Sequence, residues 1–181
     1  TPKDKRDLTF ILKEKIEWLA LSFVREAQDL ISLRKILKRN KSKIGVISKI
    51  EKPEAIKNID EIITYSNAIM VARGDLGVEI PPHRVPAVQK KIVKKAVERS
   101  RPVIIATQML ESMTYSPVAT RAEVNDVANS VIDGADAVML SGETSVGKYP
   151  VKTVDTMRKI IRDIEKSDYV FKPVFNQGLD T

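Results

Sequence analysis

The sequence from Ile44 to Pro53 reads IGVISKIEKP and joins a short apolar run to the start of a helix. The run is rich in β-branched residues, which favours a buried strand. Pro53 stands where a helix begins, because the N–H that proline lacks has no partner in the first helical turn. Parallel sheets are built from such units, since parallel strands need a crossover helix between them.

The same strand-then-helix unit recurs along the chain. We expect strands at Trp18–Phe23, Ile44–Ile50, Ala68–Ala72, Val103–Ala106 and Ala137–Leu140. The helices predicted after them are Glu26–Arg39, Pro53–Tyr65, Pro86–Ser100, Thr120–Ile132 and Pro150–Lys166, and another, about Lys3–Lys15, opens the chain. This alternation predicts an α/β fold with about five parallel strands.

Composition narrows the classes of partner. The net charge of +7 is spread over helix surfaces, as in residues 90–97, where pairs of lysines alternate with apolar pairs. That spacing predicts a solvated helix face, so we expect no nucleic-acid partner. No apolar run approaches the roughly 20 residues that span a bilayer, so no membrane partner is expected. The absence of cysteine excludes a disulfide framework and fits the cytoplasm.

Two of the predicted strands end in charged residues. Lys49 and Glu51 lie two residues apart at the end of a strand, so their side chains are expected to point the same way. Asp75 follows the next strand, between Gly74 and Gly77. Carboxylates from two neighbouring strand ends are suited to Mg²⁺, which leaves its other positions to substrate and water. The alternatives are a strand that runs out into solvent, or an Arg73–Asp75 pair within a turn.

The following two strands also end in polar segments. One continues into Thr107-Gln108-Met109-Leu110-Glu111, and the other into Ser141-Gly142-Glu143-Thr144 with Lys148 a few residues later. Because the carboxyl ends of parallel strands share one edge of a sheet, these segments are expected to form an active-site face.

These segments resemble the pyruvate kinase family. The stretch Ile44–Ile56 is similar to the active-site signature of that family. Further blocks match it in order and spacing from about Lys3 to Lys166: Met70–Gly77, Ala106–Met113, Thr120–Glu123, Asp126–Asn129 and Met139–Thr144. The resemblance implies a partial TIM (β/α)8 barrel and transfer of a phosphoryl group from phosphoenolpyruvate to ADP, giving pyruvate and ATP in glycolysis.

The resemblance also implies a role for each site residue. Lys49 would be catalytic and substrate-binding, stabilising the transferring phosphoryl group and the enolate, and Glu51 and Asp75 would hold Mg²⁺, with Mn²⁺ as a possible substitute. Gly74 and Asp75 would bind the substrate carboxylate through backbone N–H groups at the start of a short helix, and Thr107 through its hydroxyl. The further candidates are Ser22, Arg73 and Gln108 near the site, and Ser141 and Lys148 toward the nucleotide.

The chain contains fewer strands than the complete barrel of the family. A complete barrel has eight strands in about 250 residues, whereas residues 1–167 supply five strands and 168–181 are expected to form a tail or linker toward a C-terminal domain. The resemblance implies that the K⁺ ligands and an arginine at the phosphoryl group lie outside this chain. Its exposed sheet edges predict self-association, and a homo-oligomer is expected.

Three functions remain open from the sequence. The first is the metal-binding part of a pyruvate kinase. The second is a related β/α-barrel lyase or aldolase acting on pyruvate-like enolates, and the third is an assembly module that keeps the site residues without turnover.

Overall fold

The computed structural model describes residues 1–169. Its contacts divide the chain into two compact units, Thr1–Gln108 and a second that begins at Met109. Each unit is described by itself below. No helix in the described part of the chain is long and apolar enough to cross a bilayer.

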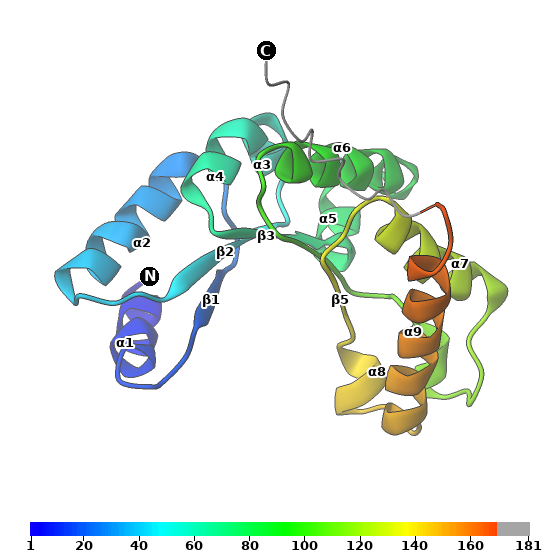
Figure 1. Cartoon of the computed structure of the whole chain (residues 1–181). Coiled ribbons are helices and arrows are strands. Elements are labelled where there is room, and N and C mark those ends of the chain that lie inside the picture. Colours follow the sequence, from blue (N-terminus) through cyan, green and yellow to red (C-terminus); the bar gives the residue numbers. More distant parts are fainter. Residues whose placement is uncertain (170–181) are drawn as a thin grey trace, which may run out of the picture. The chain divides into compact units, whose positions relative to one another are not determined.

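The first unit is built on four adjacent parallel strands (Figure 1). Along the chain they are β1 (Trp18–Leu21), β2 (Gly45–Ile50), β3 (Ala68–Ala72) and β4 (Val103–Ala106). The helices of this unit are α1 (Pro2–Ile11), α2 (Ala27–Arg39), α3 (Pro53–Lys57), α4 (Ile59–Tyr65), α5 (Arg73–Glu79) and α6 (Val85–Glu98), with a 3₁₀ turn η1 (Pro82–Arg84). Pairing of β2 with β3 sets Lys49 beside Met70, so the carboxyl ends of both strands lie at the same edge.

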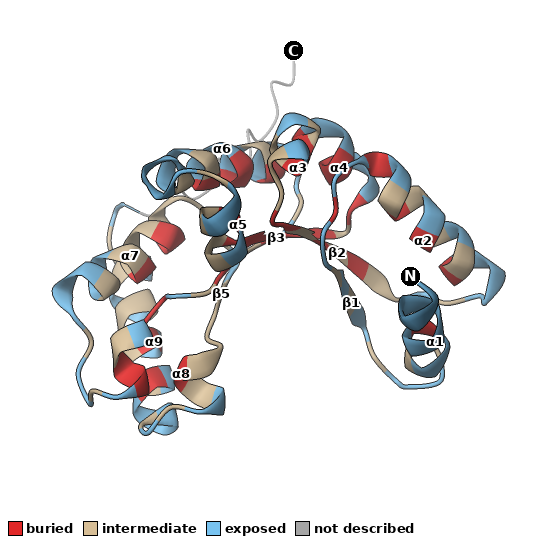
Figure 2. Ribbon diagram, turned by 180° about the vertical axis from the view of Figure 1, so that it is seen from behind, coloured by how far each residue is buried: buried red, intermediate tan, exposed pale blue. Residues whose placement is uncertain are grey.

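Burial distinguishes the two faces of this sheet. In β2 every second residue is buried, whereas Gly45, Ile47 and Lys49 are only half-buried. Helices α2, α4 and α6 lie along one side of the sheet, and their buried residues face it (Figure 2). Lys49 therefore belongs to the face that these helices leave open, while all of β3 is buried.

The second unit consists of η2 (Glu111–Thr114), α7 (Arg121–Ile132), β5 (Ala137–Met139), α8 (Gly142–Ser145) and α9 (Pro150–Glu165). Helices α7 and α9 pack against each other. Thr120 caps α7 in a capping box with Glu123, whose carboxylate also accepts hydrogen bonds from the Ser112 backbone and hydroxyl. Burial alone would raise the pKa of Glu123, but the hydrogen bonds from Ser112 and Thr120 outweigh it and lower that pKa.

The predicted strands β3 and β4 have the expected limits, and the alternation of strands with helices is confirmed. The opening helix, predicted at about Lys3–Lys15, ends at Ile11, and several other limits shift by one or two residues. The helix predicted over Pro53–Tyr65 is broken at Asn58, whose side-chain amide donates to the Arg25 carbonyl at 3.0 Å. The first strand ends at Leu21, since Phe23 turns the chain with φ 57°. The short helix that the resemblance implies after β3 is present at Arg73–Glu79. The predicted tail lies almost wholly outside the described residues, and the limits 1–167 and 168–181 stay a prediction.

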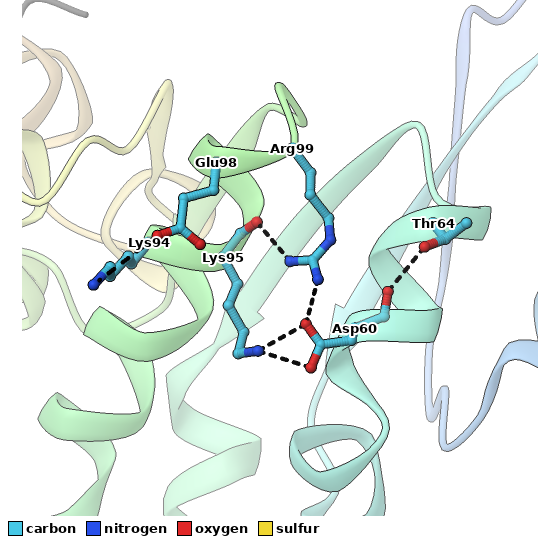
Figure 3. Close-up of polar contacts among 6 residues, drawn as sticks. All are labelled: Asp60, Thr64, Lys94, Lys95, Glu98 and Arg99. Atoms are coloured by element: carbon cyan, nitrogen blue, oxygen red, sulfur yellow. Dashed lines mark hydrogen bonds and ion pairs between the residues drawn. The ribbon is translucent and has the colours of Figure 1, made fainter.

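A cluster of charges joins α4 to α6 on the surface of the first unit (Figure 3). Both oxygens of the Asp60 carboxylate lie 2.7 Å from Lys95 Nζ, and one lies 2.6 Å from Arg99 Nη2. The hydrogen bond from Lys95 holds the pKa of Asp60 below its ordinary value, although partial burial opposes this. Because Asp60 is half exposed, screening by water limits the benefit to less than about 1 kcal/mol.

A pH dependence follows from the lowered pKa of Asp60. The contribution of this carboxylate to stability is complete above its unfolded pKa, close to 3.8, and disappears as the pH falls through the lower folded pKa. We expect Asp60→Asn to lower the free energy of unfolding by the same small amount at pH 5 and pH 7, and by less below pH 4. Urea unfolding across this range measures the difference. The matched control is the same carboxylate-to-amide change at the exposed neighbour Glu61. An effect of Asp60→Asn that persists below the pKa of Asp60 in the folded protein would contradict this explanation.

Candidate active site at the carboxyl ends of the strands

Lys49 and Glu51 meet at the end of β2, as strand alternation predicts. Lys49 Nζ lies 2.5 Å from Glu51 Oε1 and donates to Ser22 Oγ at 3.0 Å. The Lys49 side chain is 23% exposed, whereas that of Glu51 is only 1% exposed. The ammonium group is thus held at the strand end by a buried carboxylate and by a hydroxyl from the segment after β1, and it still reaches solvent.

Phe23 supports the same carboxylate, which sequence reasoning did not anticipate. Its backbone N–H donates to Glu51 Oε2 at 2.7 Å, and its φ of 57° is unusual for an aromatic residue. Lys52 Nζ lies 5.6 Å from the centre of the Phe23 ring and 2.6 Å from Glu79 Oε1 at the end of α5. The segment after β1, the end of β2 and helix α5 are therefore tied together around Glu51.

Helix α5 carries Asp75 in its first turn, directly after β3. The Asp75 side chain is exposed, in contrast to that of Glu51. Gly74 allows a close approach at this point, because a Cβ there would lie 3.2 Å from Thr107 Oγ1. The Gly74 N–H donates to that hydroxyl oxygen at 2.8 Å. The structure thus brings the predicted residues Gly74 and Thr107 into direct contact.

The Thr107–Gln108 turn at the end of β4 has a strained backbone. Both residues lie in the left-handed region, with φ of 73° and 54°. For residues other than glycine this conformation costs about 1–3 kcal/mol each and persists only where neighbours enforce it. Arg73 Nη2 donates to the carbonyl of Thr107 at 2.8 Å and to that of Gln108 at 3.2 Å. All the site residues predicted within the first unit therefore lie at or just after the carboxyl end of one of its four strands.

The donor set suits a hard divalent cation. Glu51 and Asp75 follow adjacent paired strands, and each offers carboxylate oxygens. Both Glu51 oxygens already accept a hydrogen bond or an ion pair, yet a carboxylate has about four acceptor positions, so each can accept another partner. Within residues 1–169 no group of three or more His, Cys, Asp or Glu side chains could form a complete protein cage. Mg²⁺ is usually held by one or two carboxylates together with substrate and water, so Glu51 and Asp75 are the residues that could hold it.

Ser141 and Lys148 belong to the second unit, where Glu143 organises the backbone. Its fully buried carboxylate accepts the N–H of Ser141 at 2.8 Å and that of Leu110 at 3.2 Å. The Lys148 N–H donates to the Thr114 carbonyl at 2.8 Å. Sequence reasoning missed this role of Glu143, because its only signal was a glutamate shortly after a predicted strand, between Gly142 and Thr144. The placement of Ser141 and Lys148 toward a nucleotide stays a prediction.

Comparison with known proteins assigns the chain to a family. Residues 1–154 match the family described as pyruvate kinase, barrel domain. The chain is 51% identical over 174 residues to a pyruvate kinase of Agrobacterium vitis, a match that covers 96% of this chain and 36% of that protein. It is 52% identical over 170 residues to pyruvate kinases of Staphylococcus epidermidis and Staphylococcus aureus, covering 93% of this chain and 29% of each relative.

The chain therefore spans about a third of the length of the relatives that it matches. The match confirms the predicted fold class, an α/β arrangement of five strands and helices that forms part of a TIM barrel. It also confirms the resemblance read from the strand-end motifs. This chain belongs to the pyruvate kinase barrel-domain family.

Proposed function

We propose that this chain supplies the metal-binding and enolate-binding part of a pyruvate kinase site. The reaction breaks the bond between the phosphoryl group and the enol oxygen of phosphoenolpyruvate and forms a new bond from phosphorus to ADP. The enolate then takes up a proton at carbon and becomes pyruvate. The observation that supports this proposal is the Lys49–Glu51 pair at the open end of β2, beside the strand that leads into Asp75.

Lys49 is proposed as the catalytic residue. Its ammonium group is fixed by Glu51 and Ser22 before any substrate binds, so little reorganisation is needed when negative charge develops. In phosphoryl transfer the main tasks of a protein are positioning and charge stabilisation. The half-buried position of Lys49 strengthens its electrostatic effect, because water screens it less than it screens a surface lysine.

Glu51 and Asp75 are proposed to hold Mg²⁺, or Mn²⁺ in its place. The bound cation would neutralise charge on the substrate oxygens that it contacts. Phe23 and Lys49 keep the Glu51 carboxylate in one orientation, while Asp75 is oriented by α5. K⁺ is proposed to bind with ligands outside this chain.

The substrate carboxylate is proposed to bind beside the first turn of α5. The N–H of Asp75 lies in that turn, where no carbonyl of the helix can accept it. The N–H of Gly74 is engaged by Thr107 Oγ1, so a carboxylate must share or replace that contact. The Thr107 hydroxyl is then free to donate its proton to the substrate while its oxygen faces Gly74.

The proposal also covers the wider context of the protein. The other ligands are ADP, ATP and pyruvate, the compartment is the cytoplasm, and the assembly is a homo-oligomer. The partly exposed outer strand β1 and the half-buried face of β2 support association with another chain.

A complementation experiment tests the proposed function. Residues 1–169 replace the matching segment of the Staphylococcus aureus pyruvate kinase, giving a chimera with a complete barrel. We expect ATP formation from phosphoenolpyruvate and ADP by the chimera, and none by the 181-residue chain alone, because that chain supplies only part of the site. A coupled assay for ATP and pyruvate measures both products. Pyruvate release without ATP would favour a lyase, and a folded but silent chimera would favour an assembly role.

A further inference from the structure

The left-handed turn at Thr107 and Gln108 needs an outside support. Two consecutive non-glycine residues with positive φ are rare, and threonine is branched at Cβ, which makes its φ of 73° especially unfavourable. The turn also fixes where the Thr107 hydroxyl lies, since side-chain direction follows backbone conformation. Whatever enforces this turn therefore also positions the hydroxyl.

Two successive residues of α5 hold the turn from different sides. Arg73 Nη2 contacts both carbonyls of the turn, at 2.8 and 3.2 Å. The next residue, Gly74, donates its N–H to the Thr107 side chain at 2.8 Å. The guanidinium fixes the backbone of the turn, and the amide fixes its hydroxyl. These contacts link residues 33 to 35 positions apart, so they join the start of α5 to the turn after β4.

We infer that Arg73 is a positioning residue, which holds Thr107–Gln108 in the left-handed conformation so that the Thr107 hydroxyl stays against the first turn of α5. The inference rests on the proposed function, because it concerns the substrate pocket assigned there. A guanidinium has several donors in a rigid plane and can serve two carbonyls at once, whereas lysine offers a single flexible ammonium group. Arg73→Lys therefore keeps the charge and weakens the support.

The first test does not depend on turnover. Hydrogen exchange of the Gly74 N–H is followed by mass spectrometry with fragmentation that resolves this residue, in the chimera described above. We expect Arg73→Lys and Arg73→Gln to remove protection at Gly74 while the amides of β2 keep theirs. Arg84→Lys, at an exposed arginine in η1, is the matched control and should leave Gly74 protected. Full protection of Gly74 in both Arg73 variants would overturn the inference.

The second test separates positioning from general stability. Arg73→Lys is expected to lower kcat by about tenfold or more, as is typical of a residue that orients a site ligand. In a Thr107→Ala background the same change should bring no further loss, because the hydroxyl that Arg73 positions is gone. In a Gln108→Gly background the loss should shrink, since glycine adopts positive φ without strain. An equal loss in all three backgrounds would refute the positioning role, and inactivity of the parent chimera would count against the proposed function alone.

Discussion

Replacing Lys49 by methionine is expected to reduce phosphoryl transfer by at least about 100-fold. This matches the loss that follows removal of one preorganised group that stabilises developing charge. Methionine has a similar length and keeps the apolar stem, so the main change is removal of the ammonium group. The rate of ATP formation at saturating substrates, measured in the complete-barrel chimera, gives the size of the effect.

Metal binding should respond differently from turnover in Lys49→Met. Glu51 is 1% exposed and keeps its hydrogen bond from Phe23, but it loses the Lys49 ammonium group, which lies 2.5 Å from its Oε1 in the parent protein. Its negative charge is then less compensated, so affinity for a divalent cation should not fall. Titration with Mn²⁺, followed by electron paramagnetic resonance, measures that affinity. Lys57→Met, at an exposed lysine of α3, is the control. A Lys49→Met protein that turns over at the parent rate would show that another group stabilises the phosphoryl transfer.

The sequence predicts the frame of this site because strand ends carry a clear signal. An apolar run that stops at Arg73 or Thr107 marks the limit of β3 or β4, and burial on both faces explains why the run is continuous. The joint projection of Lys49 and Glu51 follows from the two-residue period of a strand. These inferences need only local patterns, so they succeed without knowledge of the rest of the chain.

The supporting contacts depend on tertiary structure, and local patterns do not reveal them. Phe23 adopts a conformation that its own propensity disfavours, because its N–H is bonded to Glu51, 28 residues away. The two carbonyls that accept from Arg73 are likewise distant in sequence. A short turn helix such as α5 also lacks the periodicity that marks longer helices. Phe23, which sequence reasoning missed, and Arg73, which it left without a role, are thus the parts of the site that need the tertiary structure.

Replacing Asp75 by alanine is expected to weaken Mg²⁺-dependent substrate binding. Loss of an outer-shell partner lowers metal affinity by 10- to 100-fold, so loss of one of two protein ligands should lower it by at least about tenfold. Asp75 is exposed, and the Gly74–Thr107 contact joins the Gly74 N–H to the Thr107 hydroxyl without using the Asp75 side chain, so the fold of α5 should survive. The lost interaction with the helix N-terminus accounts for only about 0.3–1 kcal/mol of stability.

The measurement for Asp75→Ala is a Mn²⁺ titration with and without phosphoenolpyruvate, using the same chimera. Glu61→Ala removes an exposed acidic residue from the first turn of α4, so it controls for net charge and for the helix dipole. We expect the control to bind metal like the parent. Unchanged titration in Asp75→Ala would show that Asp75 is only a turn residue, and Glu51 would then need a different partner for the cation. A loss confined to Asp75→Ala, with unfolding transitions alike in both variants, would instead assign the effect to the carboxylate at the end of β3, because charge and helix position are matched between the two proteins.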